Sequence, residues 1–185
     1  MKKGLFFAHC SYNLLFFYHF AGRKNSAHSY KLYKKTSTPP LYLLGFDIGS
    51  SSVKAALVEA ATGQIIGAAH YPEREMDILA AQPDWAEQHP ATWWAAVCHA
   101  THKLLDKTQV APSQIAAIGI AYQMHGLVAL DAQGEVLRPS IIWCDSRAVT
   151  IGEKAFQAIG EQYCLKHYLN TPGNFTASKL RWIRE

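Results

Sequence analysis

The sequence lacks the short motifs of the commonest nucleotide-binding and hydrolytic sites. It contains no G-x-x-x-x-G-K-[ST], no G-x-G-x-x-G and no G-x-S-x-G, so a nucleotide site in this chain would be of another type. Cysteine is scarce as well: the four residues are Cys10, Cys98, Cys144 and Cys164. Their wide spacing indicates neither a zinc site nor a disulfide framework and favours a reducing compartment, which we expect to be the cytoplasm.

Acidic residues are absent from residues 1–40, which carry seven Lys and Arg residues. The whole chain has a formal charge of +4, but residues 41–185 hold 14 acidic and 11 basic residues and therefore carry −3. Such a mildly acidic body favours neither nucleic acid nor a membrane as its partner. Hydrophobic residues make up 49% of the 185 residues, enough for the core of one domain with a tail.

Residues 1–40 differ in kind from the rest. Lys2 and Lys3 precede an aromatic run with the outline of a signal peptide, but polar residues interrupt it and no clean cleavage site follows. The run is also too short and too polar for a membrane span. We expect an extension outside the fold that ends at Pro39-Pro40, with a cleaved signal as the alternative.

Residues 41–54 (LYLLGFDIGSSSVK) are the stretch on which the functional argument depends. An apolar run ends at Asp47, small residues follow, and an alternating run leads away from Val53, which predicts a strand, a tight turn and a returning strand. Gly49 would let a ligand approach the main chain, and serine hydroxyls would bind an anion. Asp47 could hold a hydrated Mg²⁺. The alternative is an ordinary hairpin turn.

The remaining pattern predicts an α/β domain. A strand over 64–71 would complete an antiparallel meander, and Pro90 would open a helix. The expected core face of that helix comprises Trp94, Val97, Cys98, Thr101, Leu104 and Leu105. Residues 115–121 (IAAIGIA) predict a strand buried on both faces. A hairpin over 127–137, a strand over 139–143 and helices over 161–169 and from 176 follow.

Polar residues at the predicted strand ends indicate a second part of the site. Gln123-Met124-His125 follows the apolar strand, and Trp143 ends another, so both could face the cleft that contains Asp47. His125 could bind a polyol hydroxyl and Trp143 could form a flat wall, although a buried histidine and a core tryptophan are the alternatives. Asp145 or Ser146 is expected to cap the next helix.

Four segments resemble a known family. LGFDIGSSSVKAALVEAATGQIIGAA resembles the first phosphate-binding hairpin of the sugar-kinase, actin and chaperone ATPases. DWAEQHPATWW, IGIAYQMHGLVALDAQGEVLRPSIIWCDSR and PGNFTASKLRWIRE resemble successive segments of the FGGY carbohydrate kinases, above all the xylulokinases. The resemblance covers residues 41–185. It implies an incomplete ribonuclease H-like α/β domain, the partial N-terminal domain of such a kinase, with a mixed sheet flanked by helices.

The resemblance implies ATP- and Mg²⁺-dependent phosphorylation of a sugar hydroxyl, with D-xylulose converted to D-xylulose 5-phosphate. The residues that match the phosphate loop are Asp47, which would reach the metal through water, and Gly49, Ser50, Ser51 and Lys54. Those that match the sugar contacts are Gln123, Met124, His125 and Trp143. Gluconate stays open as a substrate, whereas Met124-His125-Gly126 replaces the R-E-T of glycerol kinases and disfavours glycerol.

The resemblance also implies that parts of the enzyme are missing. Members of the family are longer, and their catalytic Asp and second domain lie beyond the point that corresponds to residue 185. The last helix, from 176, has no C-cap glycine, which indicates truncation. We therefore expect the isolated chain to be inactive and a full-length protein to form a homodimer. A non-catalytic module that binds a sugar or a partner protein is the alternative.

Overall fold

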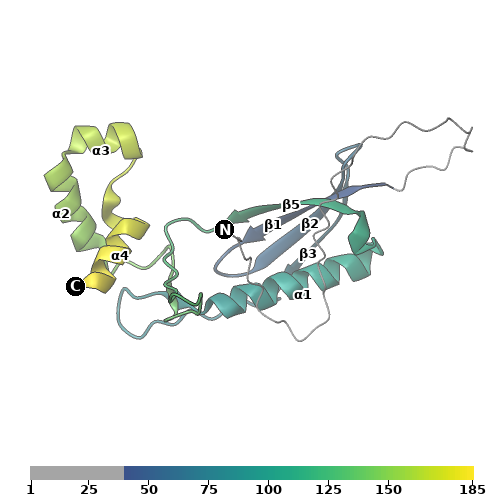
Figure 1. The fold of residues 1–185 in the computed structure, drawn as a ribbon, viewed down its shortest axis with the longest axis horizontal. Coiled ribbons are helices and arrows are strands. Elements are labelled where there is room, and N and C mark those ends of the chain that lie inside the picture. Colours follow the sequence, from purple (N-terminus) through teal and green to yellow (C-terminus); the bar gives the residue numbers. More distant parts are fainter. Residues whose placement is uncertain (1–39) are drawn as a thin grey trace, which may run out of the picture. The chain divides into compact units, whose positions relative to one another are not determined.

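The structure is a computed structural model that describes residues 40–185. The extension expected over residues 1–40 therefore lies, apart from Pro40, outside the described residues. The described part contains a four-stranded mixed sheet with the strand order β3-β2-β1-β5 (Figure 1). Its strands are β1 (Tyr42–Ile48), β2 (Val53–Glu59), β3 (Ile65–Tyr71) and β5 (Ile115–Tyr122).

The first three strands form the predicted antiparallel meander, and β5 lies parallel to β1. In this register Asp47 on β1 pairs with Lys54 on β2, while Ile48 pairs with Tyr122 at the end of β5. Parallel strands end at the same edge of a sheet. The segments that follow β1 and β5 therefore start side by side, as the sequence predicts.

One face of the sheet packs against α1 (Pro90–Thr108), which runs along it in Figure 1. Alternate residues of β1 and β2 point into this layer, as the period of two requires. The buried cluster includes Leu44, Phe46, Val53, Ala55, Leu57, Ala96, Ala100 and Leu104. The predicted helix is confirmed, but Trp94 is 43% exposed and not in the core. Ala96 and Ala100 face the sheet, and a residue two positions before Ala96 points to the other side of a helix.

The prediction that β5 is buried on both faces is wrong. Its residues from Ala116 to Tyr122 are exposed, and Ile120 reaches 60% exposure. In the described chain β5 is the edge of the sheet, because it pairs only with β1, while α1 contacts β1, β2 and β3. The apolar run correctly indicated a strand, but no element among residues 40–185 covers it.

The remaining elements are short. β4 (Glu87–Gln88) pairs with β6 (Ser140–Ile141), so the strand predicted over 139–143 is only two residues long. The hairpin predicted over 127–137 is reduced to one bridge between Leu130 and Val136. The other elements are 3-10 turns at Pro112–Gln114 and Pro172–Asn174 and helices α2 (Val149–Ile159), α3 (Glu161–Tyr168) and α4 (Thr176–Arg184).

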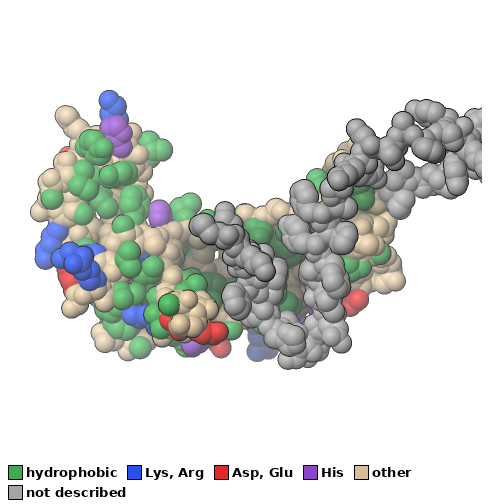
Figure 2. Space-filling view, in the orientation of Figure 1, with side chains coloured by type: hydrophobic (Ala, Val, Ile, Leu, Met, Phe, Trp, Pro, Cys, Tyr) green, Lys and Arg blue, Asp and Glu red, His purple; other side chains and the backbone are tan. Residues whose placement is uncertain are grey.

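The helices α2 and α3 carry apolar side chains on their surface (green in Figure 2). Those that are more than 40% exposed are Ile159, Tyr163, Leu165 and Tyr168, and Leu169 directly after α3 is exposed as well. None of the helices within residues 40–185 has the length and apolar character needed to cross a membrane.

Candidate functional site

The turn between β1 and β2 has the tight geometry that its small residues predict. The Gly49 N–H donates to the Ser52 carbonyl at 3.1 Å. A Cβ atom at Gly49 would lie only 3.1 Å from that same oxygen, so a larger residue would strain the turn. Glycine therefore permits the close approach that brings the serine hydroxyls to the end of the sheet.

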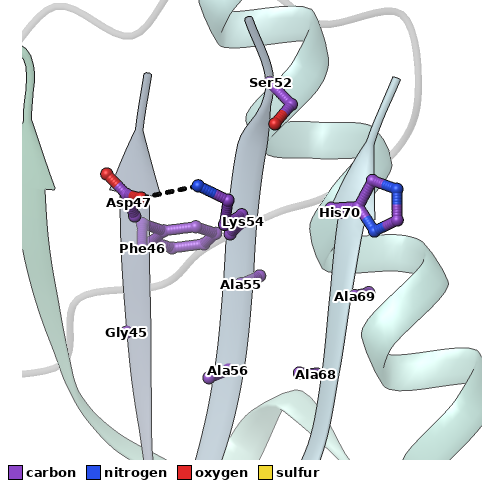
Figure 3. A pocket seen from close by; sticks show the side chains of 10 residues that line it. All are labelled: Gly45, Phe46, Asp47, Ser52, Lys54, Ala55, Ala56, Ala68, Ala69 and His70. Atoms are coloured by element: carbon purple, nitrogen blue, oxygen red, sulfur yellow. Dashed lines mark hydrogen bonds and ion pairs between the residues drawn. The ribbon is translucent and has the colours of Figure 1, made fainter. Parts of the chain in front are cut away.

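Asp47 and Lys54 face each other across the two strands. Their Oδ2 and Nζ atoms lie 3.1 Å apart, and the side chains are 53% and 64% exposed (Figure 3). An ion pair this exposed contributes little to stability, about 0–1 kcal/mol, so its groups can exchange partners at low cost. Both charges are thus available to a ligand.

These two side chains lie in an open hollow of about 670 Å³ on the sheet. Small residues on neighbouring strands, among them Gly45, Ala56 and Ala68, leave this space free (Figure 3). The hollow gives access to Asp47 and Lys54 from the face opposite α1.

The residues of the turn fit a phosphate with its divalent cation. Within residues 40–185 no group of three or more His, Cys, Asp or Glu residues is placed to hold a metal. A single carboxylate such as Asp47 suits Mg²⁺, which usually keeps several waters and binds through one or two carboxylates plus the phosphates of a substrate. The ammonium group of Lys54 could bind a phosphate oxygen.

The segments predicted to flank the site meet at the turn. The Gln123 N–H donates to the Ile48 carbonyl at 3.2 Å, and the Gln123 Oε1 atom accepts from the Trp143 main-chain N–H at 3.4 Å. The indole Nε1 of Trp143 donates to the Ser50 hydroxyl at 3.2 Å. Hydrogen bonds therefore link Ser50, Gln123 and Trp143, which come from three separate parts of the chain.

His125 has an unusual backbone conformation for a residue with a side chain. Its φ is 61°, in the left-handed region. The imidazole stacks on Phe175 with 4.9 Å between ring centroids and 21° between planes. Met124 beside it is 66% exposed and Trp143 is 49% exposed, so both can contact a ligand. The structure therefore leaves room for the predicted sugar contacts, whose roles stay predictions.

Three further residues support this site and were not singled out from the sequence. The Gln88 amide donates to the Ser50 carbonyl at 2.7 Å, and the Asn174 amide donates to the Trp143 carbonyl. Lys179 donates to the His125 carbonyl at 2.9 Å. Gln88 lies in the DWAEQHP segment, one of those that carry the family resemblance. All three contacts join residues far apart in the sequence, so no local sequence pattern could have indicated them.

Asp145 is a buried anchor, so the prediction that Asp145 or Ser146 caps the next helix is wrong. Ala148 occupies the N-cap of α2, with no side-chain hydrogen bond. Asp145 has no exposed surface and accepts from the Ala86 N–H at 2.6 Å. It also binds the Arg147 guanidinium, with Nη2 at 2.6 Å. The carboxylate oxygens are thus used by the distant Ala86 N–H and by the neighbouring Arg147, and not by the first turn of α2.

Comparisons with known proteins show the family to which the chain belongs. Residues 42–185 match the model of the N-terminal domain of the FGGY family of carbohydrate kinases. The chain is 35% identical over 141 residues to the xylulose kinase of Escherichia coli, covering 76% of this chain and 28% of that protein. It is 32% identical over 147 residues to the glycerol kinase of Thermococcus gammatolerans, covering 77% and 28%.

A crystal structure described as a xyloylose kinase from Brucella ovis superposes with a TM-score of 0.67 at 36% identity and covers 77% of this chain and 29% of that one. The fold is that of a domain of the sugar-kinase and actin-like ATPase class. The chain belongs to the FGGY family of carbohydrate kinases. It spans little more than a quarter of the length of these relatives.

Proposed function

We propose that residues 41–185 provide the sugar-binding and phosphate-binding side of an ATP-dependent kinase that converts D-xylulose to D-xylulose 5-phosphate. The observation that carries the proposal is the 3.2 Å hydrogen bond from the Trp143 indole to the Ser50 hydroxyl. It puts a flat apolar surface suited to a sugar next to hydroxyls suited to a phosphate. Phosphoryl transfer depends on such positioning.

On the phosphate side, the hydroxyls of Ser50 and Ser51 donate to phosphate oxygens, and Lys54 leaves Asp47 to bind another. The freed Asp47 carboxylate would hold the hydrated cation through its water molecules. Mg²⁺ bound with the nucleotide would neutralise part of the phosphate charge. The exposure of both side chains supports this exchange. Because Asp47 and Lys54 are still largely hydrated in their ion pair, separating them costs little free energy.

On the sugar side, His125 and Gln123 bind hydroxyls of the ketose while Met124 and Trp143 contact its carbon skeleton. The Gln123 Nε2 atom is buried and has no hydrogen-bond partner among the described residues. A buried unpaired donor is costly, so an acceptor that reaches it on ligand binding would gain the free energy otherwise lost. This atom supports a role for Gln123 in the site.

The proton of the attacking hydroxyl requires a base that these segments do not offer. Asp145 lies close in sequence to Trp143, but Arg147 and the Ala86 N–H already occupy its carboxylate. A carboxylate paired in this way cannot turn toward a substrate without losing those bonds. We therefore propose that the chain by itself binds its ligands without turnover.

D-xylulose is preferred to other substrates because Gln123-Met124-His125-Gly126 matches the xylulokinase pattern. Gluconate is the second candidate, since gluconate kinases of the family also carry Met-His, and a crystal structure of a gluconate kinase from Lactobacillus acidophilus is 26% identical with a TM-score of 0.55. The cytoplasm is the proposed compartment, and a homodimer the proposed state of a complete enzyme.

The proposal is tested by titrating the 185-residue chain with D-xylulose, D-gluconate and glycerol in a calorimeter, and by measuring ADP formation with ATP and Mg²⁺ present. We expect D-xylulose to bind most tightly and ADP to form at the background rate. His125→Ala should weaken D-xylulose binding by about tenfold or more, since a hydrogen bond to a ligand contributes ~1–2 kcal/mol. His167→Ala on the exposed surface of α3 is the matched control and should leave binding unchanged.

Absence of sugar binding, or equal binding by the His125→Ala variant, would refute the sugar site. Tighter binding of D-gluconate would replace the substrate while keeping the site. ADP formation above background that depends on D-xylulose would show that the chain contains its own base and would refute the proposal of binding without turnover.

A further inference from the structure

Lys179 is the largest fully buried side chain among residues 40–185, with no exposed surface. It lies on α4, and its ammonium group donates to the His125 carbonyl at 2.9 Å and to the Ile142 carbonyl at 2.8 Å. Burial lowers the pKa of Lys179, and the charge of Asp145 partly opposes this shift. Burying an ammonium group is costly unless hydrogen bonds compensate, so both carbonyl contacts are needed to keep it there.

The two carbonyls belong to the two segments that carry the proposed sugar contacts. His125 is itself one of these residues, and Ile142 directly precedes Trp143. The Lys179 side chain therefore ties the loop after β5 to the loop after β6 at one point. A displacement of this ammonium group would change the spacing between the imidazole of His125 and the indole of Trp143.

The conformation of His125 needs such support. A left-handed φ is unfavourable at a residue with a Cβ and persists only where the surroundings hold it. The start of α4 contacts His125 in two ways, because Phe175 stacks on the ring and Lys179, one turn later, holds the carbonyl. The Lys179 N–H also donates to the Phe175 carbonyl at 3.2 Å, which joins the two contacts in the first turn of the helix.

We propose that Lys179 is a positioning residue of the sugar site, which orients the His125 imidazole relative to Trp143 by holding the carbonyls of His125 and Ile142. It acts through these groups and does not touch the sugar. The effect on the ligand rests on the proposed function, whereas the effect on His125 does not.

The test compares Lys179→Met with Lys166→Met in the 185-residue chain. Methionine keeps most of the volume and removes the donors, and Lys166 is an exposed residue of α3, which makes it the matched control. The His125 ring resonances are followed by NMR, and D-xylulose affinity is measured by calorimetry. We expect the His125 ring to move away from the Phe175 ring in Lys179→Met, which changes the chemical shifts of the His125 ring because the ring-current effect of Phe175 is lost. We also expect D-xylulose binding to weaken about tenfold, which corresponds to ~1.4 kcal/mol.

Lys179→Arg, which keeps donors at this position, should restore part of the His125 resonance position, whereas a merely space-filling role would favour Met over Arg. A folded Lys179→Met protein with unchanged His125 resonances would overturn the proposal. If that variant does not fold, the measurement is made on the wild-type protein. Scalar couplings across the hydrogen bonds from Lys179 Nζ to the carbonyls of His125 and Ile142 would support the proposal, and their absence would overturn it.

The two proposals can fail separately. If the wild-type chain does not bind D-xylulose but Lys179→Met still moves His125, the proposed function fails and the positioning role is supported. If D-xylulose binds and the Lys179→Met variant binds it equally well with His125 unmoved, the positioning role fails and the proposed function is supported.

Discussion

Replacing Asp145 with asparagine should destabilise the domain far more than its small change in shape suggests. Asp145 is fully buried and its partner Arg147 has a side chain only 2% exposed. The guanidinium stacks over Trp85, 3.7 Å from the ring centroid, so it cannot turn out to water without breaking that contact as well. The substitution therefore leaves a buried cation with less compensating charge.

The magnitude follows from the remaining partners of Arg147. Removing one member of a buried ion pair costs about 3–5 kcal/mol. Glu87 still lies 2.7 Å from the guanidinium in the variant, although Arg138 also shares that carboxylate. Asparagine can accept one of the hydrogen bonds through its Oδ1 atom. We therefore expect the low end of the range, about 3 kcal/mol, out of the roughly 5–15 kcal/mol that holds a domain folded.

Urea unfolding followed by tryptophan fluorescence measures this loss. Asp131→Asn is the matched control. Among residues 40–185 the Asp131 carboxylate accepts only from the main-chain N–H groups of Gln133 and Glu135, and an asparagine oxygen can accept from them too. We expect the control to change the free energy of unfolding by less than about 1 kcal/mol. A loss below about 1 kcal/mol in Asp145→Asn, with an unchanged urea dependence, would refute the argument that this ion pair is a buried anchor.

Two further predictions concern other parts of the domain. Gly152→Ala should lower the melting temperature, because its Cβ would lie 2.3 Å from the Cα of Gly173. Overpacking costs about 1–3 kcal/mol, which exceeds the ~1 kcal/mol that alanine gains over glycine in a helix. Gly119→Ala, where a Cβ meets open space, is the control and should not lower the melting temperature. A hydrogen bond from Lys103, aided by its charge, lowers the pKa of Glu73, so Lys103→Met should raise the NMR titration midpoint of Glu73. The stability this carboxylate contributes is present above its unfolded pKa and is lost as pH falls through the folded value, and an unmoved midpoint would contradict the assignment.

The hairpin of β1 and β2 could be predicted from the sequence because its determinants are local. Alternating apolar residues indicate β1 and β2, and small residues with Gly49 indicate the turn between them. Since antiparallel pairing across a tight turn sets the register, the opposition of Asp47 and Lys54 follows from the same few residues.

The features that could not be predicted depend on distant contacts. Asp145 has the residue type and position of a helix cap, but in the folded chain its carboxylate accepts from the distant Ala86 N–H and pairs with Arg147. Lys179 reads as the polar side of an amphipathic helix, yet it is buried because two carbonyls from other segments surround its ammonium group. The apolar composition of β5 indicates a strand but does not say which element covers it.

The hydrogen bond between Trp143 and Ser50 has a consequence for how the two ligands would influence each other. The Ser50 hydroxyl carries one proton, and accepting the indole N–H leaves that proton free to point elsewhere. A molecule that moves the Trp143 indole therefore also changes the direction in which the Ser50 hydroxyl can donate its proton. Thermodynamic linkage would make the relation reciprocal: if a sugar bound at Trp143 changed the affinity of Ser50 for an anion by some factor, the anion would change the affinity for the sugar by the same factor.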